Sequence, residues 1–177
     1  IHWLKSRQGE GQPIRKDGPE SHPLTKKGTP TMGGLLILIA VTTATLLWAD
    51  LSNRYVWAVL IVTLGFGTIG FFDDYLKLSK RSSDGLPGKV KLVAEIAIAG
   101  AVAWWISEIT LDPLATGLAV PFFKNLLIDL GWFFIPFAAL VMVGASNAVN
   151  LTDGLDGLAI VPAMIVAGCL ALITYIV

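Results

Sequence analysis

The stretch that decides the fold runs from Tyr55 to Phe72 and reads YVWAVLIVTLGFGTIGFF, eighteen residues without a charge. At about 1.5 Å per residue, a helix of this length is about 27 Å long, close to the hydrocarbon thickness of a bilayer. Four further apolar runs surround it in the chain. The sequence therefore predicts an all-α, polytopic membrane helix bundle with about five transmembrane helices, at residues 33–49, 55–72, 91–111, 130–147 and 158–177.

The composition points to the same class of protein. Hydrophobic residues make up 54% of the 177 and charged residues only 15%, and the mean hydropathy is +0.69. This mixture is not that of a soluble globular domain. The net charge of zero gives no basic surface for a nucleic acid, and the single cysteine, Cys169, leaves neither a disulfide nor a zinc site within the chain. We expect an integral membrane protein that does not bind nucleic acid.

Charges in the connecting segments predict the orientation. Residues 1–32 carry six Lys or Arg and residues 73–91 carry five, whereas the other side receives only Arg54 and Lys124, so eleven of the thirteen lie on one side. Basic loops face the cytoplasm. We therefore predict a cytoplasmic loop at residues 1–32 and a transmembrane bundle at residues 33–177. Within the bundle, residues 73–90 and 148–157 are predicted to be cytoplasmic connections. Residues 112–129 are predicted to form a turn or small hairpin on the outer side.

The segment NAVNLTDGLDGL, residues 147–158, has polar side chains at every third position, Asn147, Asn150, Asp153 and Asp156, with Gly154 after the first acid. A carboxylate at the bilayer centre costs about 2.5–3.5 kcal/mol on insertion scales, so such residues mark functional sites. A spacing of three drifts by about 60° per step around an α-helix, which predicts that the helix ends or loosens near Gly154. An Asp-Gly turn with an N-cap is the alternative, but it leaves both asparagines unexplained.

A second acidic motif, Asp73-Asp74, follows the second apolar run, and Lys77 lies one turn further on. Adjacent side chains on a helix point about 100° apart, so one acid can hold a metal while the other takes a different partner. Such a pair beside a lysine suits Mg²⁺-assisted phosphoryl transfer. Anchoring at the headgroups is the alternative; it explains the lysines, but acids at a helix C-terminus oppose the dipole and need a compensating partner.

Two weaker features complete the polar inventory. The basic, glycine-containing segment from Lys26 to Gly34 enters the first helix and could cradle a phosphate, although lysines before a membrane helix are also expected from topology alone. Glu95 lies inside the third apolar run. It either pairs with a lysine or lines the cavity, and the sequence leaves both readings open.

Four motifs carry a family resemblance: PESH at residues 19–22, KGTPTMGG at 27–34, DDY at 73–75 and NAVNLTDGLDGLA at 147–159. Together they resemble the polyprenyl-phosphate N-acetylhexosamine-1-phosphate transferases. The first two motifs favour the phospho-N-acetylmuramoyl-pentapeptide branch over relatives that transfer N-acetylglucosamine phosphate. The resemblance extends over the whole chain in order.

The resemblance implies a ten-helix enzyme with its active face on the cytoplasmic side of the bacterial inner membrane. Such an enzyme moves phospho-MurNAc-pentapeptide from UDP-MurNAc-pentapeptide to undecaprenyl phosphate, giving lipid I and UMP in peptidoglycan biosynthesis. It implies Mg²⁺ as cofactor, and as partners the two substrates, the lipid bilayer and a second copy in a homodimer. The alternatives are a related GlcNAc-1-phosphate transferase or, in a different class, an ion-coupled transporter subunit.

The resemblance also implies site residues, at the positions where this sequence matches the family's motifs. Asp73, Asp74 and Asp153 are the implied catalytic acids and candidate metal ligands. The family's further aspartate motif and its His-rich loop have no counterpart here, so the chain corresponds to helices two to six of ten and is expected to be inactive alone. The implied substrate-binding residues are Lys26, Thr31, Lys77, Lys89, Asn147, Asn150, Gly154 and Asp156.

Overall fold

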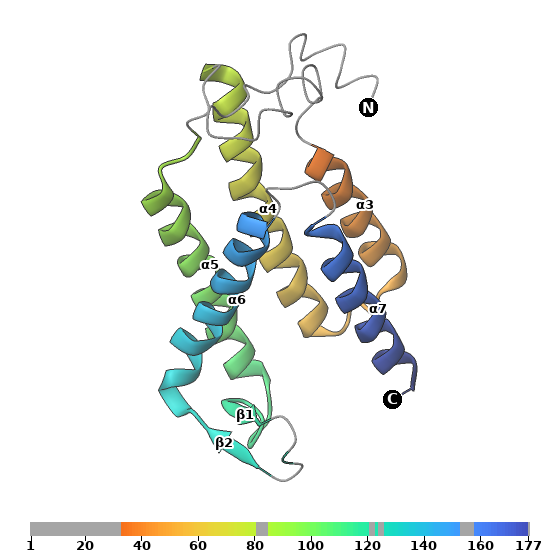
Figure 1. Ribbon diagram of the computed structural model, residues 1–177. Helices are drawn as coiled ribbons and strands as arrows, with labels where there is room; N and C mark the ends of the chain where they lie inside the picture. Colours follow the sequence, from red (N-terminus) through yellow and green to blue (C-terminus); the bar gives the residue numbers. More distant parts are fainter. Residues whose placement is uncertain (1–32, 81–84, 121–122, 124–125, 153–157, 177) are drawn as a thin grey trace.

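The structure, a computed structural model, describes residues 33–80, 85–120, 123, 126–152 and 158–176. It confirms the predicted all-α class (Figure 1). Two short strands, β1 and β2, and one turn of 3₁₀ helix, η1 (Gly131–Phe133), lie between the third and fourth of the described helices. The α-helices of the described ranges are α3 (Gly33–Trp48), α4 (Arg54–Lys80), α5 (Gly88–Ile109), α6 (Phe134–Thr152) and α7 (Ile160–Ile176).

Within the described ranges, three helical segments are long and apolar enough to cross a membrane: Arg54–Lys80, Gly88–Ile109 and Gly131–Thr152. The helices α3 and α7 are shorter, with 16 and 17 residues, and neither has a buried residue. Their large hydrophobic side chains are exposed, Ile37 and Leu47 to 67% each and Ile173 to 57%. A continuous apolar surface of this kind is unusual in water but is what a helix presents to lipid.

Several helix ends differ from the predicted bounds. The helix α4 continues to Lys80, so residues 73–80, which we predicted as loop, are helical. An ion pair between Lys77 and Asp73 at a spacing of four residues supports this extension, and basic residues in the last turn suit the helix dipole. In the same way α6 continues to Thr152, past the bound at Asn147 that the apolar run predicts and toward Gly154, near which the polar motif predicts that the helix ends or loosens. The length of an apolar run predicts which residues lie in the hydrocarbon core of the membrane. The helix itself can extend into water, as long as its backbone hydrogen bonds continue.

The helix α5 is the centre of the bundle, because it packs against both α4 and α6. Its Ala99 is fully buried against Ala139 and Val143 of α6, with Phe66 of α4 beside them. Small residues at this crossing let the helices approach closely, as is usual in membranes. A Cβ at Gly65 of α4 would lie only 3.0 Å from the Ile98 side chain of α5, so the approach of α4 to α5 is also close.

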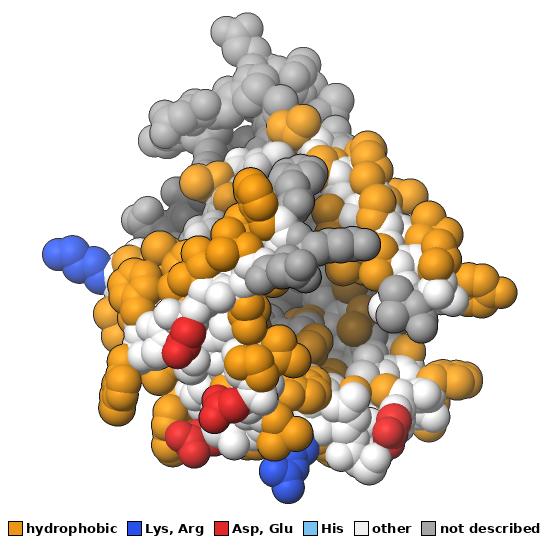
Figure 2. Space-filling view, turned by 90° about the horizontal axis from the view of Figure 1, so that it is seen from below, with side chains coloured by type: hydrophobic (Ala, Val, Ile, Leu, Met, Phe, Trp, Pro, Cys, Tyr) orange, Lys and Arg blue, Asp and Glu red, His pale blue; other side chains and the backbone are white. Residues whose placement is uncertain are grey.

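The connection between α5 and α6, predicted as a turn or small hairpin, contains a hairpin in which β1 (Gly117–Ala119) pairs antiparallel with β2 (Leu127–Asp129). The Thr116 hydroxyl (2.5 Å) and the Gly131 N–H (2.8 Å) donate to Asp129 Oδ1. These bonds hold the pKa of the Asp129 carboxyl below its ordinary value of 3.8. The hairpin lies at the opposite end of the bundle from the end of α4 (Figure 1), and from that end the described surface is largely hydrophobic with isolated charges (Figure 2).

Candidate active site

The described residues of the predicted site lie at one end of the bundle, where α4 ends, α5 begins and α6 ends (Figure 1). This follows from the packing, because consecutive helices joined by short segments run antiparallel. Asp73, Asp74 and Lys77 come from α4, Lys89 from α5 and the two asparagines from α6. The other predicted site residues lie outside the described residues: Lys26, Thr31, Asp153, Gly154 and Asp156.

The Asp73 carboxylate is held by two donors. Lys77 Nζ lies 2.5 Å from Asp73 Oδ2, and the Leu86 backbone N–H donates to Asp73 Oδ1 at 2.7 Å. The first donor is one helical turn away, whereas the second comes from the segment that precedes α5, thirteen residues further along the chain. Bonds to both oxygens fix the plane of the carboxylate, so Asp73 is oriented before any ligand arrives.

Gly85 makes the Leu86 bond sterically possible. A Cβ at position 85 would lie 2.0 Å from Asp73 Oδ1 and 2.8 Å from Lys77 Cε, distances that no real Cβ tolerates. Only a residue without a side chain therefore lets this segment approach the Asp73 carboxylate. Neither Gly85 nor Leu86 was predicted as a site residue. The available signal was the turn-forming sequence Gly-Leu-Pro-Gly before a helix, residues 85–88.

Asp74 is less constrained than its neighbour. Its one contact among the described residues is Lys77 Nζ, 3.5 Å from Oδ1, and its side chain is 36% exposed, against 20% for Asp73. The two carboxylates thus share Lys77 but differ in access. Asp74 is the one that a ligand from solution reaches more easily.

A second polar cluster joins α5 to α6. The Asn147 side-chain amide donates to Glu95 Oε2 at 2.5 Å and to the Val143 carbonyl at 3.0 Å. Lys91 Nζ lies 3.9 Å from Glu95 Oε1. Of the two readings that the sequence left open for Glu95, pairing is the one observed, since this residue is only 2% exposed.

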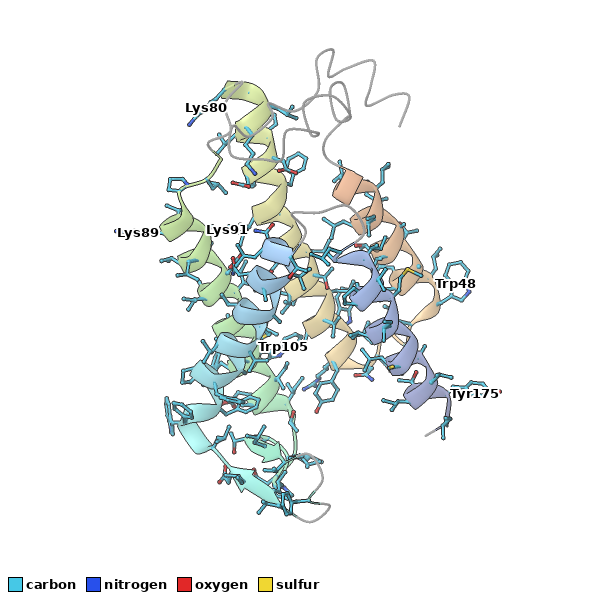
Figure 3. All side chains as sticks on the ribbon, viewed as in Figure 1. Trp48, Lys80, Lys89, Lys91, Trp105 and Tyr175 are labelled. Atoms are coloured by element: carbon cyan, nitrogen blue, oxygen red, sulfur yellow. The ribbon has the colours of Figure 1, made fainter. Side chains whose placement is uncertain are left out.

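Lysines of α5 that lie two residues apart point in different directions. Lys91 points into the bundle (Figure 3), and its charge acts on Asp73 as well as on Glu95. Lys89 is exposed and points away from the bundle (Figure 3), so the structure does not bring it to the acidic pair. Asn150 is also exposed, at the end of α6. Lys91 is thus the lysine of this pair on the bundle side, and the substrate-binding role of Lys89 stays a prediction.

The donor set at this end of the bundle suits a hard cation. Asp73 and Asp74 supply carboxylate oxygens, which are the ligands that Mg²⁺ prefers. Within the described ranges, no group of three His, Cys, Asp or Glu could hold a metal ion. Further ligands would therefore come from water, from substrate phosphates or from residues outside those ranges, as is usual for Mg²⁺ sites.

The helices and this acidic end together define an integral membrane protein with a candidate phosphate-handling site at one membrane face. The chain belongs to glycosyl transferase family 4, whose sequence model matches residues 56–177. Residues 26–38 match signature 1 of phospho-N-acetylmuramoyl-pentapeptide-transferase. The chain is 65% identical over its 177 residues to the protein of that name from Granulibacter bethesdensis, and it spans 49% of that relative's length. The predicted family resemblance is confirmed.

Proposed function

We propose that this chain is part of an enzyme that transfers phospho-MurNAc-pentapeptide from UDP-MurNAc-pentapeptide to undecaprenyl phosphate, giving lipid I and UMP. The observation that carries the proposal is the 65% identity, over the whole chain, to a relative whose name states the transfer of phospho-N-acetylmuramoyl-pentapeptide. The proposal includes the bacterial inner membrane as location, with the acidic end of the bundle facing the cytoplasm, and a second copy as partner in a homodimer.

The roles of the acidic pair follow from their different environments. Asp73 has both oxygens engaged by Lys77 and Leu86 and is the oriented member. Asp74 is more exposed and is the better Mg²⁺ ligand. Held by Asp74, Mg²⁺ would neutralise phosphate charge. Asp153, predicted from its motif, is the candidate for a further ligand.

The reaction needs positioning more than base catalysis. A phosphate oxygen of the lipid attacks the sugar-linked phosphorus, the bond from that phosphorus to the UMP oxygen breaks, and UMP leaves with the electron pair. A phosphate monoester has a second pKa of about 6, so the attacking oxygen is already largely ionised near neutral pH. Lys77 lies beside both acids and is placed to stabilise the charge that develops on the phosphates.

The test is UMP release by a protein of the relative's full length that carries this chain, reconstituted in lipid. We expect release that requires Mg²⁺, undecaprenyl phosphate and UDP-MurNAc-pentapeptide together. Release with UDP-GlcNAc in place of that donor would favour the related GlcNAc-1-phosphate transferase. Ion flux in sealed vesicles without UMP release would favour the transporter reading, against which stands the position of the acids at one end of the bundle.

A further inference from the structure

Glu95 is a buried charge that the proposed chemistry does not use. It is the one polar or charged residue among the buried side chains of the described ranges, at 2% exposure, and it lies within a segment apolar enough to cross a membrane. A carboxylate in such a place needs partners, and removing one of them leaves an uncompensated charge. Its partners therefore indicate what it does.

The first partner lies on the neighbouring helix. Asn147 of α6 uses one amide hydrogen on Glu95 Oε2 and the other on the Val143 carbonyl, so both side-chain donors of Asn147 are occupied inside the bundle. This geometry argues against a donor role for Asn147 toward a substrate. Through the hydrogen bond of Asn147 to Glu95, α5 instead limits how the end of α6 can rotate about its axis.

The second partner connects Glu95 with the acidic pair. Lys91 lies one helical turn before Glu95, with Nζ 3.9 Å from Glu95 Oε1, and it points into the bundle (Figure 3). Its charge also acts on Asp73. Direct polar contacts therefore run from Lys91 and Glu95 on α5 to Asn147 on α6, and the Lys91 charge reaches Asp73 on α4 only through space.

We propose that Glu95 is a positioning residue that holds the end of α6, through Asn147, in a fixed orientation relative to Asp73. The exposed Asn150 lies three residues beyond Asn147 on the same helix, so its direction depends on this contact. The inference rests on the proposed function, because the purpose of the contact is to align two parts of one active site.

A polarity swap tests the proposal. Asn147→Asp places a second carboxylate against Glu95, and we expect kcat for UMP release to fall about a hundredfold, as for a misplacement of about 1 Å, with KM little changed. Glu95→Gln with Asn147→Asp restores a hydrogen bond with donor and acceptor exchanged. We expect the double variant to recover kcat to within about tenfold of the wild type. Glu108→Gln is the matched control, because Glu108 lies on the same helix but is exposed, and it should remain near the wild-type rate.

The outcomes are distinguishable. Suppose that the wild type is active, that kcat of the double variant is no higher than that of Asn147→Asp, and that both variants have a raised KM for the UDP substrate. This result overturns the inference and indicates that Asn147 binds substrate. A wild type without UMP release overturns the proposed function and this inference with it. If Asn147→Asp does not fold, folding of the double variant with recovered kcat supports the contact. If neither folds, Glu95→Leu alone decides, because leucine cannot accept the Asn147 amide hydrogen, and an unchanged kcat overturns the proposal.

Discussion

The contact between Gly85 and Asp73 gives the sharpest prediction. In Gly85→Ala the new Cβ would lie 2.0 Å from Asp73 Oδ1, whereas a comfortable contact between heavy atoms is about 3.5 Å. The difference is about 1.5 Å, and one partner has to move by that amount. The Asp73 carboxylate is the end of a side chain and rotates more easily than the backbone shifts. We therefore expect the carboxylate to leave its present orientation while the fold persists.

The size of the effect follows from what this rotation breaks. Asp73 Oδ1 loses the hydrogen bond from the Leu86 N–H, and hydrogen bonds to charged groups are worth about 1.5–3 kcal/mol. Because the Asp73 side chain is 20% exposed, water replaces part of the loss, and stability falls by about 1–2 kcal/mol. Stabilities of about 5–15 kcal/mol tolerate that loss. A reacting group displaced by about 1 Å, however, loses about a hundredfold in rate.

The assay measures kcat and KM for Mg²⁺-dependent UMP release in the full-length protein, together with the thermal midpoint of the same preparation. Gly88→Ala is the matched control, because a Cβ at Gly88 meets nothing within 4 Å; it should retain most of the activity. Wild-type kcat in Gly85→Ala would refute the reasoning. An equal loss in both variants would also refute it, since the loss would then come from any glycine replacement near the start of α5.

Three further predictions concern other parts of the molecule. Asp74→Asn should raise the Mg²⁺ concentration for half-maximal UMP release and lower kcat at least about a hundredfold; an unchanged Mg²⁺ requirement contradicts the metal role. Thr42→Val should raise the thermal midpoint in detergent, by a stabilisation of about 1 kcal/mol, because Thr42 Oγ1 is buried without a partner among the described residues; a lowered midpoint contradicts this. The Asp129 pKa is lowered in the folded protein, so its stabilising effect is present above 3.8 and lost as pH falls below that value. The drop in midpoint between pH 5 and pH 3 should therefore be smaller in Asp129→Asn, and an identical drop would contradict the assignment.

Much of the fold could be predicted because an apolar run of membrane length has few alternatives to a spanning helix. The ends of the helices could not be predicted in the same way. The polar residue Asp73 indicates where the membrane ends, but its ion pair with Lys77 allows α4 to continue past that position. Within the site, Lys89 and Lys91 differ by two positions, which is about 200° around a helix. Selecting the lysine that points into the bundle therefore required the rotation of α5, which depends on its packing against α4 and α6.

Contacts between residues distant in the sequence could not be predicted either, because they also depend on how the helices pack against one another. Asn147 and Glu95 are 52 residues apart, and each was interpreted from its own surroundings. Asn147 was interpreted as a substrate-binding residue and Glu95 as an acid that pairs with a lysine or lines the cavity. The polar motif at residues 147–158 contains no information about which residue of α5 lies beside Asn147. Only the crossing of α5 and α6 at small residues such as Ala99 and Ala139 brings the two side chains together.

The charges of the described cluster predict that a cation binds before a phosphate. Asp73, Asp74 and Glu95 carry three negative charges and Lys77 and Lys91 carry two positive ones, so this part of the site has a net charge of −1. It repels a free diphosphate and attracts a divalent cation, which changes the sum to +1. We therefore expect UDP-MurNAc-pentapeptide to bind at least about tenfold more weakly when Mg²⁺ is removed with EDTA, measured by calorimetry on the full-length protein. Equal affinity with and without Mg²⁺ would show that lysines alone compensate the phosphates, and the acidic pair would then need a different role.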